Sequence, residues 1–151
     1  MEGDYTQART LIDDSEALFR DLKDDGGLAE VLITKGRIQR EQGQVAAAYR
    51  TLTEALQLAQ QVGPRLLVAA ALEGLSAVTI QLEQVTLAVQ LLSAAAALRE
   101  EMGAPIRPVD RPFVDRALST AQSTLGHDKF TVVWLEAREL PLEQLLGSQS
   151  E

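Results

Sequence analysis

Residues 43–60 read GQVAAAYRTLTEALQLAQ, and two other segments align with them without a gap. Residues 3–20 (GDYTQARTLIDDSEALFR) lie 40 positions earlier, and residues 83–100 (EQVTLAVQLLSAAAALRE) lie 40 positions later. In each segment, apolar residues at spacings of 4 and 6 keep to one side of an α-helix. The aligned apolar positions are Ala8, Ala48 and Ala88; Ile12, Leu52 and Leu92; Leu18, Leu58 and Leu98. The chain therefore consists of helical repeats with a period of 40 residues, starting near residues 3, 43 and 83.

A breaker follows each of these segments, and a second helical stretch follows each breaker. Gly26-Gly27, Gly63-Pro64 and Gly103 are expected to end the three helices, with glycine in the left-handed cap position and proline blocking continuation. The sequence predicts helices at residues 4–22, 27–42, 44–61, 65–81, 84–101, 109–124, 127–138 and 141–147. We expect an all-α fold, a right-handed α–α superhelix of about seven main helices in antiparallel pairs with a short C-terminal helix.

Length and composition limit the classes of function. The chain has 151 residues, which suits a single domain over 1–151 whose last helices, about 109–147, act as a cap. It contains no cysteine, and its formal net charge is −8. Such a charge repels phosphate groups and anionic lipids, so we expect no direct binding to nucleic acid or membrane. The polar N-terminus has no signal-peptide pattern, and a cytoplasmic location is expected.

Few residues are candidates for a catalytic or metal-binding role. His127 is the only histidine, and it stands where a late helix should begin. The acidic pairs Asp13-Asp14 and Asp24-Asp25 do not converge on one atom, because neighbours on a helix point about 100° apart. No phosphate-binding loop motif is present. We therefore expect no catalytic residue, no cofactor and no metal site, and no enzymatic activity.

Two features are expected to serve packing. The run from Ala94 to Ala97 covers all sides of one helical turn, which suits a helix held between close neighbours. Phe130 and Trp134 lie four residues apart on a predicted terminal helix, where they should cover the apolar face of the last repeat. An exposed aromatic anchor for a partner is the alternative for these two residues.

The repeats resemble the tetratricopeptide type. Its Gly-Asp-Tyr-x-x-Ala pattern is matched by Gly3, Asp4, Tyr5 and Ala8, and small residues expected midway along a first helix fall at Gly36 and Ser76. The third repeat departs from the pattern, because Glu83 replaces the turn glycine and Arg116 stands at the small-residue position. The period also exceeds the usual length of about 34 residues, which implies longer helices.

A narrower resemblance covers residues 91–145, through Leu91-Leu92, the Ala-Leu-Arg-Glu block at 97–100, Phe130 and Trp134. This stretch is similar to the C-terminal repeat region of large bacterial LuxR-type regulators and related signal-transduction ATPases. The resemblance implies that the chain is part of a longer protein. It also implies a non-catalytic regulatory module that binds a protein or peptide, including other domains of the same polypeptide.

The expected binding surface is the concave face, which the first helix of each pair lines in tetratricopeptide proteins. The residues predicted there are Glu30, Ile33, Arg37, Arg40, Glu73, Ala77, Ile80 and Phe113. One alternative is a sensor for a small-molecule inducer, with a pocket among Ile33, Ala77, Ile80 and Phe113. Another is an oligomerisation element, in which the first helix, lacking the partner of its pair, stacks on a second chain to give a homodimer.

Overall fold

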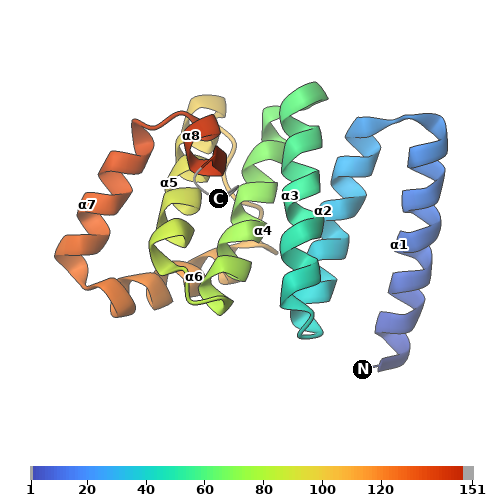
Figure 1. Ribbon diagram of the computed structural model, residues 1–151, viewed down its shortest axis with the longest axis horizontal. Coiled ribbons are helices and arrows are strands. Elements are labelled where there is room, and N and C mark those ends of the chain that lie inside the picture. The colour runs from blue at the N-terminus through green and yellow to red at the C-terminus, as the bar shows by residue number, and fades with distance from the viewer. Residues whose placement is uncertain (1, 148–151) are drawn as a thin grey trace. The chain divides into compact units, whose positions relative to one another are not determined.

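The computed structural model describes residues 2–147, and within this range it consists of helices and short turns without a β-strand. The helices are α1 (Glu2–Leu22), α2 (Asp25–Glu41), α3 (Val45–Val62), α4 (Arg65–Gln81), α5 (Val85–Met102), α6 (Arg111–Leu125), α7 (His127–Arg138) and α8 (Leu142–Gly147) (Figure 1). The predicted all-α class is confirmed. Each predicted helix boundary falls within two residues of the observed one.

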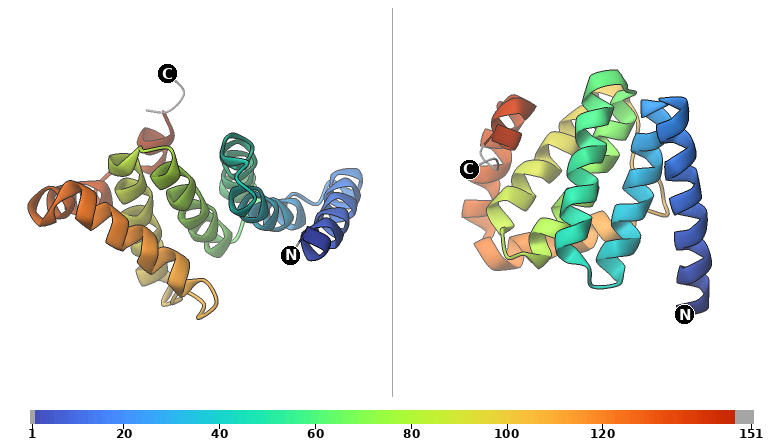
Figure 2. Two further views of the ribbon diagram at one scale, coloured as in Figure 1. Left: turned by 90° about the horizontal axis from the view of Figure 1, so that it is seen from below. Right: turned by 45° about the vertical axis from the view of Figure 1, so that its right-hand side comes forward.

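The helices form two compact units, Met1–Gly74 and Leu75–Glu151, and the boundary between them falls inside α4. In the first unit α2 packs against both α1 and α3. Figure 2 shows α1 on one side of α2 and α3 on the other. Within this unit α1 is therefore an edge helix, with α2 as its main neighbour.

The packing of α3 against its neighbours depends on two glycines that face Leu52. A Cβ atom added to Gly36 of α2 would lie 2.5 Å from Leu52 Cγ, and one added to Gly74 of α4 would lie 3.0 Å from Leu52 Cδ2. The contact at Gly36 is shorter than real Cβ atoms make, and the contact at Gly74 is tighter than most of them. The absence of a side chain at these positions therefore lets both helices approach α3 closely. Leu52 is fully buried as a result.

Replacing Gly36 with alanine is expected to destabilise the protein even though alanine favours helix. The added methyl group must displace Leu52, at a cost of about 1–3 kcal/mol that exceeds the gain of about 1 kcal/mol from helix propensity. Urea unfolding should give a lower midpoint for Gly36→Ala than for the wild-type chain. Gly26→Ala in the same helix is the matched control, because its nearest neighbour would be 3.7 Å away and its midpoint should not fall. A Gly36→Ala variant as stable as Gly26→Ala would contradict this packing.

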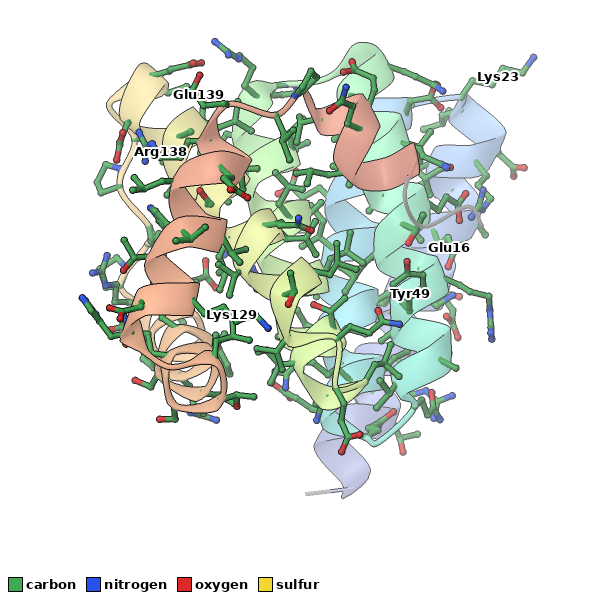
Figure 3. All side chains as sticks on the ribbon, turned by 60° about the vertical axis from the view of Figure 1, so that its left-hand side comes forward. Glu16, Lys23, Tyr49, Lys129, Arg138 and Glu139 are labelled. Atoms are coloured by element: carbon green, nitrogen blue, oxygen red, sulfur yellow. The ribbon has the colours of Figure 1, made fainter. Side chains whose placement is uncertain are left out.

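Of the glycines expected to end α1, α3 and α5 in a left-handed cap, Gly63 and Gly103 do end their helices, and one of them has the predicted conformation. Gly103 has the predicted left-handed conformation, with φ of 63°. Gly63 ends α3 in an extended conformation, and Gly26 and Gly27 lie in the first turn of α2. Lys23 takes the left-handed position after α1, with φ of 55°, and its side chain points into solvent (Figure 3). The prediction was wrong for the glycine pair because Asp24 caps α2 through its side chain, so the new helix starts before the glycines.

The same helix end occurs twice at a distance of 40 residues. Gly43 after α2 and Glu83 after α4 both have positive φ, of 81° and 62°. In each case the backbone N–H of the next residue donates a hydrogen bond to the carbonyl five residues earlier. Gln44 N donates to Gln39 O and Gln84 N donates to Thr79 O, both at 2.8 Å. The substitution of glycine by glutamate at position 83 therefore leaves the cap geometry unchanged, although a residue with a Cβ atom is strained there.

Glu83→Gly is expected to raise the free energy of unfolding by about 1 kcal/mol, because glycine adopts the left-handed conformation without strain. Gly43→Ala, at the equivalent cap, should lower it by a similar amount. Both changes can be measured by urea unfolding of the full chain. If Glu83→Gly had no effect or the opposite one, the cap at Glu83 would not be strained.

In the second unit α5 contacts α6, α7 and α8. Phe130 of α7 packs with Val89 of α5 and Ala121 of α6, and the rings of Phe130 and Trp134 stack with centroids 5.7 Å apart. The predicted covering role of these two aromatic residues is therefore confirmed for α5 and α6. Ser93 Oγ also donates a hydrogen bond of 2.7 Å to the Trp134 carbonyl.

The alanine run lies in the middle of this unit. Ala94 and Ala95 are buried, and Ala96 and Ala97 are half-buried. Close neighbours therefore cover the side of this turn that carries Ala94 and Ala95, whereas the sequence pattern predicted cover on all sides. At the far end of α7, Arg138 (Figure 3) donates hydrogen bonds to the Glu100 carboxylate of α5.

Candidate protein-binding surface

Five of the residues predicted to bind a partner lie in the first unit, and they differ in exposure. Glu30 is exposed, whereas Ile33 and Glu73 are buried, with 5% and 6% of their surface accessible. Arg37 and Arg40 are half-buried, and both arginines and Glu73 take part in interactions inside the chain. Glu30 is thus the member of this group whose side chain is freely accessible on the surface of the unit.

The other three predicted residues lie in the second unit. Ala77 is half-buried, and Ile80 packs against the apolar clusters of α5 and α6. Phe113 is 37% exposed, and the guanidinium carbon of Arg116 lies 5.7 Å from its ring centre. The predicted set is thus divided between the two units, and its assignment to one partner-binding face stays a prediction.

A pocket of about 360 Å³ lies between α1 and α2 and is open on one side. Two apolar residues of α1, Ile12 and Phe19, form one wall. Its complete lining is Ile12, Phe19, Gly27, Glu30, Val31 and Thr34. The pocket forms where Phe19 meets α2 at Gly27, since a Cβ atom on Gly27 would lie 2.6 Å from the Phe19 ring.

Three leucines form an exposed apolar stripe along α1. Leu11, Leu18 and Leu22 are 67%, 55% and 65% exposed. Their spacings of 7 and 4 place them on one face of the helix. At the repeat position of Leu11, Leu91 of α5 is 1% exposed. We call Leu11, Leu18 and Leu22 the α1 stripe.

The opposite face of α1 is held by ion pairs. Glu16, midway along the helix (Figure 3), accepts hydrogen bonds from Lys35 Nζ at 2.7 Å and from Arg20 Nη2 at 2.9 Å. Arg20 Nη2 also donates to Glu54 of α3 at 3.1 Å. Arg20 is about 180° around the helix from the α1 stripe. The stripe therefore points away from α3.

These ion pairs also shift the pKa values of Glu16 and Arg20. Burial raises the pKa of the Glu16 carboxyl, but the hydrogen bonds from Lys35 and Arg20 outweigh it and hold that pKa below its ordinary value. The hydrogen bond to Glu16 raises the pKa of Arg20. Both cations are therefore engaged on the α3 side of α1. The stripe lies on the other side of α1, and Ile12 and Phe19 of the pocket wall lie between the stripe and Glu16 around the helix.

Sequence reasoning singled out α2 for binding and missed the contribution of α1. The missed residues are the α1 stripe and the pocket residues Ile12 and Phe19. One signal was available, because Phe19 stands where the aligned segments have Ala59 and Arg99. A large aromatic residue at a position filled elsewhere by alanine indicates a local change in packing.

Among the residues considered as catalytic or metal-binding candidates, His127 and Asp24 lie at helix ends. His127 is exposed and begins α7, as predicted. Asp24 Oδ1 accepts a hydrogen bond of 2.9 Å from Gly27 N and so caps α2. Among the side chains that the structure describes, no three histidine or acidic residues gather in a way that could hold a metal ion. None of the helices described combines the length and apolar character that a membrane span needs.

Comparisons with protein-family models, curated proteins and solved structures found no match for this chain.

Proposed function

We propose that the chain is a non-catalytic protein-interaction module and that its binding surface is the α1 stripe with the adjoining pocket. The observation that carries the proposal is the exposure of Leu11, Leu18 and Leu22, each more than half accessible on one helix face. Contiguous apolar side chains on a surface cost free energy in water, and they commonly mark a site where another protein binds.

The pocket adds to this surface a concave region that has both apolar and polar lining residues. Ile12 and Phe19 supply an apolar wall, while Glu30 and Thr34 supply polar groups at the opposite side. A pocket open on one side accepts a side chain projecting from a partner, whereas a small-molecule site usually encloses most of its ligand. We therefore favour a protein or peptide over the small-molecule inducer.

The expectations drawn from the sequence complete the proposal. The eight helices would continue as a right-handed α–α superhelix, and the module would act in the cytoplasm of a bacterium. It would regulate transcription or a signalling ATPase, bind another domain or protein, and use no cofactor. Of the residues predicted for the concave face, Glu30 would contribute to this surface through the pocket.

Photocrosslinking tests the proposed surface in cells that naturally express the chain. A benzoylphenylalanine placed at Leu18 should form a covalent adduct with a discrete protein, identified by mass spectrometry. The same group placed at the exposed position Arg50 of α3 is the matched control and should not form this adduct. A second change, Leu11→Glu, should reduce the Leu18 adduct because it places a charge in the apolar contact.

Two results would count against the proposed surface. The first is the same adducts from Leu18 and from Arg50, which would indicate random collision. The second is crosslinking of Leu18 to another copy of the chain alone, which would favour the oligomerisation element instead. Light scattering of the purified chain over a range of concentrations identifies such a dimer independently.

A further inference from the structure

We infer that the partner supplies an amphipathic helix, which packs on α1 as α2 packs on α3. This inference rests on the proposed function and names the partner of the same surface. Its starting point is Leu52, which is held between Gly36 on one side and Gly74 on the other. Helix α3 therefore has a close helical neighbour on each side of this residue.

Only one of these two neighbours has a counterpart at α1. Ile12 stands 40 positions before Leu52, and Thr34 stands 40 positions before Gly74. Ile12 and Thr34 line the same pocket, so the contact of α1 with α2 repeats the contact of α3 with α4. Within the first unit, α2 is the helix whose backbone lies close to that of α1, whereas Leu52 of α3 faces both α2 and α4. Among the described residues of this unit, no helix takes the place against α1 that α2 takes against α3.

The burial of the repeat positions shows the consequence of the missing neighbour. Leu52 and Leu92 are 0% and 3% exposed, whereas Ile12 at the same position of α1 is half-buried. Ala55 and Ala95 are 0% and 1% exposed, whereas Ser15 is half-buried. A helix with a small residue opposite Ile12 would complete this burial, because a glycine occupies that place against Leu52.

The charge beside the stripe specifies the partner further. Asp14 and Asp21 are exposed along the outer edge of the stripe, and neither forms an ion pair with a described residue. The partner helix should therefore carry arginine or lysine on this edge. A second copy docking through its own α1 would oppose acid to acid, which disfavours it.

The probe for this inference is the sequence of α2 itself, as a hydrocarbon-stapled peptide of residues 24–42. Staple positions Glu30 and Thr34 lie away from Gly36 on the helix, so the staple leaves the docking face free. Titration into isotope-labelled full chain should shift the methyl signals of Ile12 and Leu18 in nuclear magnetic resonance spectra. Signals of the second unit should not change.

A control peptide carrying Gly36→Leu tests the geometry of docking. It should bind at least about tenfold more weakly, because a side chain at this position collides with the residue that the glycine faces. A second peptide, with Arg37→Gln and Arg40→Gln, tests the charge. Its affinity should fall about threefold for the wild-type chain and should not fall for a chain with Asp14→Asn and Asp21→Asn.

Three outcomes overturn the inference: no shifts at Ile12 and Leu18 with excess peptide, equal binding of the Gly36→Leu peptide, or the same shifts produced by unlabelled chain alone. The proposed function is judged separately by the adduct at Leu18. If that adduct forms with a partner while the peptide fails, the surface binds proteins but does not recognise a helix of this kind. If the peptide binds and no adduct forms, the inference about helix recognition stands and the proposed cellular role fails.

Discussion

The contact of Leu52 with Gly36 and Gly74 is the constraint on which the first unit depends. A leucine held between two glycines fixes how closely α2 and α4 approach α3, and this close approach buries the apolar face of α3 completely. The same repeat position in α1 is Ile12, which has a neighbour on one side. Ile12 is half-buried, and Leu11 beside it is 67% exposed.

In the second unit, the close approach of neighbouring helices depends on different residues. Alanines at Ala94 and Ala95 let the neighbours of α5 come close, and the Phe130 ring of α7 fills the space beside Val89. The Ser93 hydroxyl adds a hydrogen bond to the backbone of α7. Helix α5 is therefore covered by three helices that follow it in the chain, whereas α1 has α2 as its main neighbour within the first unit.

Much of the fold could be predicted from the sequence, because helix periodicity and breakers are local signals. The period of 40 residues located the helices, and it placed Phe130 and Trp134 correctly on the last repeat. The capping role of Asp24 was missed, because a glycine pair is a stop signal in most contexts. Gly63 ends α3 as predicted, but in an extended conformation in place of the left-handed one.

The candidate surface was harder to predict, because a helical pattern does not show which apolar positions have a neighbour. Leu11 has the repeat position of Leu91, which is buried in α5, so the exposure of Leu11 depends on tertiary packing. Leu18 aligns with Leu58 and Leu98, which are half-buried. Ile33 shows the opposite case. It lies near the predicted concave face of α2, yet it is buried in the unit.

The most direct test of the central claim is amide hydrogen exchange across the two aligned helices of the full chain. If α1 is a repeat helix that lacks one neighbour, amides of residues 8–18 should exchange faster than the aligned amides of residues 48–58. The difference should exist throughout the helix and not only at its first turn. Equal protection of the two segments would show that α1 is as fully covered as α3, and would contradict this account.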